Sequence, residues 1–472
     1  MRPADVQLSF ADLEFLKQGI ALEPTLQAIA DFLDEHRTIV QRVRRDLVRG
    51  LKKPRTGRTG LTAQQALRSL VLMRVKNWDY RELRERIADG YTLRLFTDFN
   101  SQRVPKHDAF NRAFNRLTLA TLQAVNDAVI RAAVTLGLED GTKLRVDTTV
   151  VETDIHHPTD NTLLWDSVRV LTRLVWKLDI MLPAGVGAFT NRTRSARRRM
   201  QEIQRMTARA RPRQQVRKYR ALIKIADQVI TDARAVLIRT VRVRGVNAMT
   251  GVAVDTLRQE IARHCELGTR VVRQATRRVL QGQQVPTEEK LYSIFEPHTD
   301  LIIRGKVLKP VEFGHKVFLA ESGRRLITQY RVLDGNPADQ VHVQPSLDRH
   351  HAIFASAPDL YSSDRGFFNE ENLRTCQSAG VALTCIPQAG GKRSAEREAL
   401  ETSRAFKRGQ RFRAGIEGRI SVLFRGRGMK RALVEGREHF ELFVGAAVLA
   451  NNLIVIAELL RRKAARRRRP AA

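Results

Sequence analysis

The pattern of apolar and polar residues predicts helices for the first part of the chain. Apolar residues recur at helical spacing through residues 1–137. Thr62 followed by Gln65 has the spacing of a helix capping box, and the same pattern recurs at Asp79. Gly137 follows the last of these segments as a stop signal. Short helices with short turns are compatible with a helix-turn-helix module and also with a plain helical domain.

The pattern changes from helical spacing to alternation at Lys143. In KLRVDTTVV, the even-numbered positions from Leu144 to Val150 share one face, and the odd-numbered positions, Asp147 among them, share the other. This alternation with β-branched residues predicts a strand. Helical periodicity then returns over residues 162–282.

Strand signals come back in the last third of the chain. Strands are predicted for 315–322, 323–335, 357–364 and 381–387, with a helix over 367–380. A strand, helix, strand order with single-helix crossovers indicates that part of this sheet is parallel. We therefore expect an α/β domain with a mixed sheet.

The longest apolar stretch, Phe440 to Leu460, contains Glu441, Asn451 and Asn452, which are unfavourable in a bilayer. We interpret it as a buried helix, predicted over 441–462, and expect no membrane span. The basic tail after it, 461–472, is predicted to be disordered and to be either a DNA-contacting arm or a solvated end.

The charge of the chain indicates a polyanionic partner. The 472 residues include 83 Lys and Arg against 50 Asp and Glu, a net charge of +33. Nucleic acid is the first candidate. Three cysteines without metal-ligand spacing exclude a disulfide framework and a zinc site. An N-terminus without an apolar core segment argues against a signal peptide, so we expect a cytoplasmic, nucleoid-associated protein.

One segment, residues 191–220, is far more basic than a solvated helix face. It carries Glu202 as its single acid among many arginines. A solvated face would mix the two signs, so contact with phosphates is the favoured interpretation. Neither a Walker A sequence nor a GxSxG sequence is present, so the sequence indicates neither ATP use nor serine hydrolase chemistry.

Three acids stand in settings that suit catalysis. Asp147 lies in the first predicted strand, Asp364 ends a predicted parallel strand, and Glu417 lies beside the apolar face of a predicted helix. Two divalent ions held by carboxylates can activate a nucleophile and stabilise a leaving oxygen in phosphodiester cleavage. Taken singly, each acid also has a plain structural role available: an ion-paired strand residue, a helix cap, or the partner of Arg413 at i,i+4 spacing.

A second acidic cluster follows the first strand. Glu152, Asp154, His156, His157 and Asp160 make a His/carboxylate metal site conceivable. The favoured interpretation is that these residues shape the edge of the active site or contact DNA. Trp78 and Trp165 lie at helical spacing with aliphatic residues and are interpreted as core.

Several stretches together resemble a known family. They are RVDTTVVETDIHHPTDNTLLWDSVRVL, SIFEPHTDLIIRGK, KPVEFGHKV, YSSDRGFFNEEN and FRAGIEGRISVLFRGRGMKR, which cover most of residues 140–431. They resemble DDE-type insertion-sequence transposases with an RNase H-like catalytic domain, in the group related to ISNCY-type elements. The helical stretch RTGLTAQQALRSLVLMRVKNWDYRELRERI also resembles the N-terminal region of such transposases.

The resemblance implies the roles of the three acids. Asp147, Asp364 and Glu417 correspond to the catalytic, metal-binding acids, with Mg²⁺ as cofactor and Mn²⁺ as its substitute. Arg413 matches an arginine that accompanies the glutamate in many relatives. Gln410 stands where those relatives have a tyrosine; where they have a lysine, this chain has Phe424, followed by an arginine. The arginines expected to contact DNA are Arg365, Arg413, Arg419 and Arg425, together with Arg197, Arg198 and Arg199.

These features predict a domain organisation and a reaction. We expect a helical DNA-binding region over 1–137, an RNase H-like catalytic domain over 138–161 and 283–460, a helical arginine-rich insertion over 162–282, and the tail. The long separation between Asp147 and Asp364 is the reason to expect an insertion, which we predict to contact the element end or a second subunit.

The resemblance implies metal-dependent cleavage at transposon ends and strand transfer to double-stranded target DNA, by a homodimer or larger assembly bound to DNA. Two alternatives stay open: an RNase H-like nuclease or resolvase without strand transfer, and a non-catalytic DNA-binding protein from a decayed element.

Overall fold

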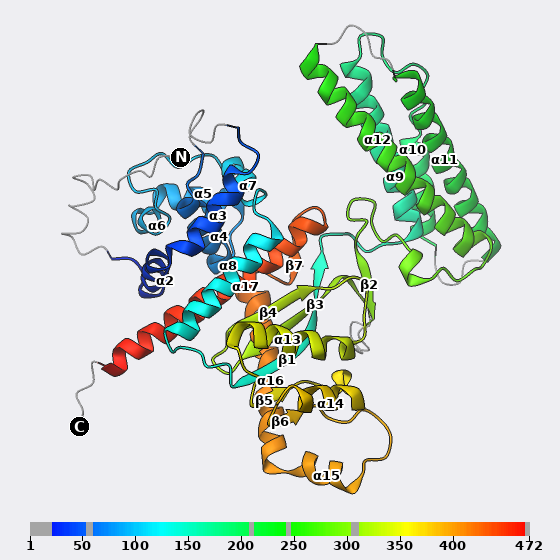
Figure 1. The fold of residues 1–472 in the computed structure, drawn as a ribbon. Coiled ribbons are helices and arrows are strands. Elements are labelled where there is room, and N and C mark those ends of the chain that lie inside the picture. Colours follow the sequence, from blue (N-terminus) through cyan, green and yellow to red (C-terminus); the bar gives the residue numbers. More distant parts are fainter. Residues whose placement is uncertain (1–20, 53–59, 207–211, 242–246, 304–310, 468–472) are drawn as a thin grey trace. The chain divides into compact units, whose positions relative to one another are not determined.

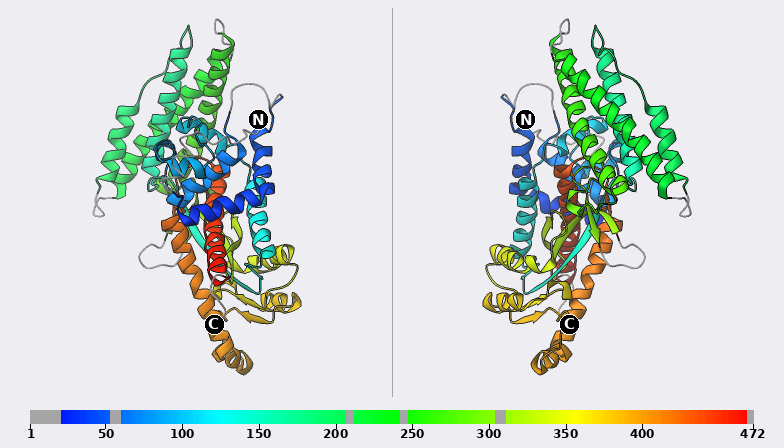
Figure 2. Two further views of the ribbon diagram at one scale, coloured as in Figure 1. Left: turned by 90° about the vertical axis from the view of Figure 1, so that its left-hand side faces the viewer. Right: turned by 90° about the vertical axis from the view of Figure 1, so that its right-hand side faces the viewer.

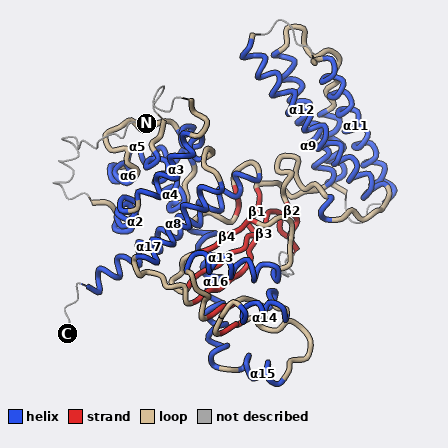
Figure 3. The backbone as a smooth tube through the Cα atoms, in the orientation of Figure 1, coloured by secondary structure: helices blue, strands red, loops and turns tan. Residues whose placement is uncertain are grey.

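The computed structural model describes residues 21–52, 60–206, 212–241, 247–303 and 311–467. It is a mixed α/β structure in which helices predominate and the strands gather into one seven-stranded sheet (Figures 1 and 3). The expected mixed α/β class is thereby confirmed.

The chain divides into two compact units. Unit 1 comprises residues 1–152 and 315–472, and unit 2 comprises 153–314. The boundary at the second junction falls inside a single strand, β3 (Val311–Ser322). The domain boundaries expected from the sequence stay predictions.

Short helices fill the N-terminal part of unit 1. They are α2 (Pro24–Glu35), α3 (Arg37–Val48), α4 (Ala63–Lys76), α5 (Tyr80–Asp89), α6 (Tyr91–Phe96), α7 (His107–Phe114) and α8 (Leu119–Thr135). The predicted capping box at Thr62 is confirmed, because its side chain and that of Gln65 each accept a hydrogen bond from the other's backbone N–H. Asp79 caps α5 through hydrogen bonds from two backbone N–H groups.

The sheet is built mainly from unit 1. Its strands are β1 (Lys143–Thr153), β2 (Asp300–Ile303), β3, β4 (Ile327–Val332), β5 (Leu360–Ser362), β6 (Leu383–Cys385) and β7 (Arg431–Ala432). The order is β2-β3-β1-β5-β6, with β4 also paired to β3 and β7 to β1. β5 is parallel to both β1 and β6, whereas β3 is antiparallel to β4. The predicted parallel part of the sheet is therefore confirmed.

The two faces of β1 and β3 pack against different helices. In one apolar cluster, Leu144 and Phe318 pack with residues of α13 (Val343–Phe354). The same cluster includes residues of α14 (Glu370–Ser378) and of the segments on either side of it. Another joins Val151 and Leu319 to α16 (Arg404–Gly426) and α17 (Arg437–Arg467). Even and odd positions of β1 thus face opposite layers, as the alternation predicted. Helix α15 (Ala395–Thr402) precedes α16.

Helix α17 is the core helix of unit 1. Within the described residues, it is the single helix long and apolar enough to cross a membrane, but 72% of its most apolar window is buried inside the protein. It packs against α2, α4 and α8, and Figure 2 shows α17, in red, from two further sides. This burial agrees with the predicted core helix.

The prediction of disorder for the tail is wrong for most of its length. Helix α17 continues to Arg467. Alanine and arginine are strong helix formers, so the segment prolongs a helix that the core has already nucleated. The rest of the tail, 468–472, lies outside the described residues.

Unit 2 is formed mostly by four helices. They are α9 (Asp160–Met181), α10 (Thr193–Gln204), α11 (Pro212–Arg239) and α12 (Ala248–Ala275), followed by short helices η1 (Thr276–Leu280) and η2 (Thr287–Glu289). Their apolar faces share one core, in which Trp165 is partly buried as predicted. The basic stretch 191–220 forms α10 and the start of α11, and its residues 207–211 lie outside the described residues.

Two glycines let α16 lie close against the sheet. A Cβ added at Gly409 would collide with the Cys385 side chain, and one at Gly415 would collide with Arg145. Both partners belong to strands. The Ser362 hydroxyl also donates a hydrogen bond to the Gly409 carbonyl, at 2.9 Å. This close approach determines where the residues of α16 lie relative to β1 and β5.

Alanine at Gly409 is expected to destabilise the protein by about 1–3 kcal/mol, because it overpacks a filled interface. Gly418, on the same helix, has nothing within 4 Å of an added Cβ. Alanine there is expected to stabilise by about 0.5–1 kcal/mol through helix propensity. Urea unfolding followed by circular dichroism measures both values. Equal effects at the two positions would contradict the close packing of α16.

Candidate active site

Strand β1 carries Asp147 into a nearly closed setting. The residue is 8% exposed and lies on the odd face of the strand, toward α16. Its Oδ1 accepts a hydrogen bond from the backbone N–H of Thr148 at 2.8 Å. A carboxylate held this way is fixed in orientation but poorly solvated.

Strand β5 brings Asp364 to the same level of the sheet. Arg145 of β1 is paired with Ser362, the last residue of β5. Asp147 follows two residues later within β1, and Asp364 follows two residues after the end of β5. Asp364 also begins a short 3₁₀ helix, where its Oδ1 accepts a hydrogen bond from the Gly366 N–H at 2.9 Å. The predicted strand-end position and the helix-cap role therefore coexist in one residue.

The side chain of Arg413 lies among the three predicted acids. Its Nη2 is 3.0 Å from Oδ2 of Asp147 and 3.7 Å from Oδ2 of Asp364. Its Nη1 is 3.3 Å from Oε1 of Glu417, one turn further along α16. The i,i+4 pair is thus present, and the same guanidinium also binds the other two carboxylates.

The acids differ in their exposure to water. The Glu417 side chain is 69% exposed and that of Asp364 is 37% exposed, against 12% for Asp147. The site is therefore closed at β1 and open toward α16. A substrate approaching from solvent would meet Glu417 and Asp364 before Asp147.

Burial raises the pKa of Asp147 to about 6. The Arg413 charge and the Thr148 hydrogen bond lower this pKa, while the neighbouring carboxylates of Asp364 and Asp339 raise it. The carboxylate form of Asp147 is therefore under-compensated by the protein's own cations. Additional positive charge at this point would be bound favourably.

A fourth acid at the site, Asp339, was missed by the sequence reasoning. Its Oδ1 accepts a hydrogen bond from the Thr148 hydroxyl at 3.0 Å and pairs with Nζ of Lys316 at 2.8 Å. Lys316, on β3, is 9% exposed. Asp339 follows β4 in the stretch NPADQ, where it resembles an ordinary loop or capping acid. No local pattern distinguishes it.

Gln410 has a structural role in this fold. Its side-chain amide donates hydrogen bonds to the carbonyls of Ser363 and Cys385, at 3.2 and 2.6 Å. It thereby ties α16 to the carboxyl ends of β5 and β6, beside Asp364. Phe424 packs in the cluster under α17.

The arginines expected to contact DNA have different surroundings. Arg365 and Arg425 are exposed. Arg419, in contrast, is largely buried and already paired. Its side chain is 12% exposed, and its Nε lies 3.1 Å from a carboxylate oxygen of the fully buried Glu321. Arg145 pairs with the same glutamate at 2.8 Å. Arg419 thus belongs to a buried Arg–Glu–Arg triad that joins β1, β3 and α16.

The arginines of unit 2 border a hollow at the start of α10. Arg197 and Arg198 are exposed and line a hollow of about 830 Å³ together with Arg192, Arg194 and Trp165. Arg199 is paired with Glu202 at 2.8 Å. Net positive charge around an open, polar hollow is an arrangement that suits phosphate groups.

The residues after β1 do not gather into a His/carboxylate site. His156 pairs with Asp166 at 2.6 Å, and Asp160 pairs with Arg278 at 2.8 Å. The hydrogen bond from Asp166 raises the pKa of His156. Across the described ranges, no group of three His, Cys, Asp or Glu side chains is placed to hold a metal ion.

Comparison of the chain with family models, with curated proteins and with solved structures gave no match in any of the three. The site is accordingly interpreted from its own geometry.

Proposed function

We propose that unit 1 contains an RNase H-like catalytic domain. The support is topological. A hairpin of β3 and β4 joins β1, and β5 and β6 continue on the other side as parallel strands linked by a helical crossover. Helix α16 then packs over β1 and β5. An RNase H-like domain has its acids on the first strand, at the end of the next parallel strand and on a late helix, and these are the settings of Asp147, Asp364 and Glu417.

We further propose that the protein is a DDE transposase that cuts DNA at transposon ends and joins the freed 3′-hydroxyl to target DNA. One observation carries this proposal: carboxylates from three separate elements meet around one positive charge, the Arg413 guanidinium. Carboxylate oxygens are the ligands that Mg²⁺ prefers, and the raised pKa of Asp147 leaves room for more positive charge. The chemistry of these oxygen ligands suits Mg²⁺ or Mn²⁺, which Asp147, Asp364 and Glu417 would hold once Arg413 had withdrawn from between them.

The chain's own residues define the rest of the proposed mechanism. Bound divalent ions would supply nucleophile activation and leaving-group stabilisation. Arg413 compensates part of the negative charge of the acids in the metal-free protein, and it is placed to contact a phosphate once the acids hold metal. The Asp339–Lys316 ion pair and the hydrogen bond from the Thr148 hydroxyl to Asp339 fix the buried side of the site, next to Asp147. Exposed Arg365 and Arg425, with the net charge of +33, favour DNA as substrate.

A non-catalytic DNA-binding protein is the second candidate. The observation in its favour is the same guanidinium, since an arginine paired with all three acids can replace a metal as a permanent structural cation. The two candidates differ in one respect. Only the transposase requires the three carboxylates to release Arg413 and bind metal ions in its place.

The test is a cleavage and strand-transfer assay on DNA that carries the flanking element ends, with Mg²⁺, Mn²⁺ or EDTA. Wild type is compared with Asp364→Asn and with Asp348→Asn, an exposed acid on α13. Joined products that need metal and disappear only in Asp364→Asn support the transposase. Cut but unjoined products favour a nuclease or resolvase, and binding without metal-dependent products favours the non-catalytic candidate.

A further inference from the structure

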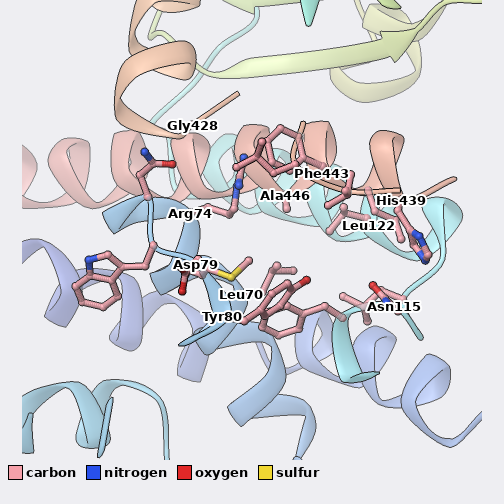
Figure 4. A pocket seen from close by; sticks show the side chains of 18 of the residues that line it. Leu70, Arg74, Asp79, Tyr80, Asn115, Leu122, Gly428, His439, Phe443 and Ala446 are labelled. Carbon is pink, nitrogen blue, oxygen red and sulfur yellow. The ribbon is translucent and has the colours of Figure 1, made fainter. Parts of the chain in front are cut away.

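A pocket of about 370 Å³ lies in unit 1, away from the acids of the candidate active site. Figure 4 shows it between the N-terminal helices and α17. Its apolar and aromatic walls include Leu70, Trp78, Tyr80, Leu122, Phe443 and Ala446. The function proposed above makes no use of it.

A buried arginine lines this pocket. Arg74, on α4, is 6% exposed, and its guanidinium carbon lies 3.9 Å from the ring centre of Phe443. Its Nε and Nη2 are buried and have no hydrogen-bond acceptor among the described residues. Burial lowers the pKa of Arg74 to about 10, which still leaves the side chain charged at neutral pH. A buried cation with unsatisfied donors is unfavourable unless an anion joins it.

The acids that line the pocket are engaged elsewhere. Asp79 accepts hydrogen bonds from the backbone N–H groups of Arg81 and Glu82 at the start of α5. The Glu82 carboxylate faces Arg86, at 3.5 Å. Neither acid is among the charges that shift the pKa of Arg74. The protein's own carboxylates therefore leave this guanidinium without a counter-ion.

The other cations of the pocket are also accounted for. Arg431 pairs with Glu152 at 3.5 Å, and a ring nitrogen of His439 is hydrogen-bonded to the Glu435 carbonyl. Because Arg74 is a single unpaired cation beside apolar walls, we expect a ligand with one negative charge. A carboxylate supplies one, whereas a phosphate monoester carries about −1.5 to −2 at neutral pH.

We propose that this pocket binds a small monocarboxylate with an apolar body. The carboxylate pairs with the charged guanidinium of Arg74, which lines the pocket. The apolar body packs against Leu70, Leu122 and the aromatic rings. Because α4, α8 and α17 all line the pocket, the ligand would brace the N-terminal helices against the core helix. The proposal does not depend on the transposase assignment.

The test measures binding of benzoate, 4-phenylbutyrate and octanoate to the full chain by calorimetry and by the shift in melting temperature. The neutral analogue 4-phenylbutyramide and inorganic phosphate serve as comparison ligands. Arg74→Met removes the charge, and it should still fold, since it replaces an unpaired buried cation with a side chain of similar shape. Arg84→Met, at an exposed position of α5, is the matched control.

We expect at least one of the carboxylates to bind wild type and Arg84→Met equally. We expect binding to Arg74→Met to be at least about tenfold weaker, as the loss of a charge-assisted hydrogen bond predicts. The amide should bind wild type as weakly as the carboxylate binds Arg74→Met. Equal binding to wild type and Arg74→Met, or no binding of any carboxylate at millimolar concentration, overturns the proposal. Arg74-dependent binding of phosphate alone overturns the carboxylate assignment.

Discussion

Replacing Asp147 with asparagine is expected to slow strand transfer strongly while making the metal-free protein more stable. Asparagine keeps the shape of the side chain and the acceptor for the Thr148 N–H, but it loses the charge that a metal ligand needs. Removal of one such electrostatic group lowers catalytic rates by roughly 10²- to 10³-fold. The assay measures joined DNA products per unit time, with Asp348→Asn as the matched control. Retained strand transfer in Asp147→Asn would remove this residue from the site.

The stability effect has the opposite sign because of the pKa of Asp147. Its folded-state pKa is raised to about 6 from an ordinary value of 3.8, so ionisation destabilises the fold. The cost is absent below pH 3.8, grows between 3.8 and 6, and is constant above, at about 3 kcal/mol. Urea unfolding in EDTA should therefore show Asp147→Asn as the more stable protein at pH 8. The gain should shrink as the pH falls from 6 toward 4. A pH-independent difference would show that the buried charge is not its cause.

Replacing Glu321 with glutamine is expected to destabilise unit 1 by about 3–5 kcal/mol, because it leaves two buried arginines without their carboxylate. Glu321 is fully buried, and its two oxygens bind Arg145 and Arg419. A glutamine would also direct an amide donor at a guanidinium. The free energy of unfolding from urea denaturation provides the measurement.

Glu85→Gln, at an exposed position of α5, is the control and should change stability by less than about 0.5 kcal/mol. The triad joins residues two positions from Asp147 and Glu417, so its loss should also lower activity under conditions in which the variant is folded. A loss of stability below about 1 kcal/mol would show that Arg145 and Arg419 do not depend on the Glu321 carboxylate for their stability in the fold.

Local signals in the sequence predicted local structure well. The alternation from Lys143 predicted β1 and assigned Asp147 to the correct face, because side chains alternate along any strand. The Thr62 capping box was confirmed because both partners lie within one turn. The end of the helix before Gly380 was also predicted from a local signal, because glycine readily adopts a positive φ. In the structure Gly380 has a φ of 86° just after the end of α14.

The parts of the site that depend on distant partners could not be predicted in this way. Arg419 resembles a free basic residue in the sequence, and only the fold brings it to Glu321 of β3. Asp339 reaches the site through a turn after β4 that carries no distinctive pattern. The tail after Leu460 is charged enough to suggest disorder, yet the buried part of α17 nucleates a helix that continues as far as Arg467.

The attachment of unit 2 has a mechanical consequence for the proposed chemistry. The chain leaves unit 1 after Glu152, near the end of the strand that carries Asp147, and returns at His315, next to Lys316. Both connections are therefore strands that contribute side chains to the site. Any displacement of unit 2 would act through two extended segments on the residues that form the site. Engagement of a remote partner could thus adjust the alignment of the acids without touching them.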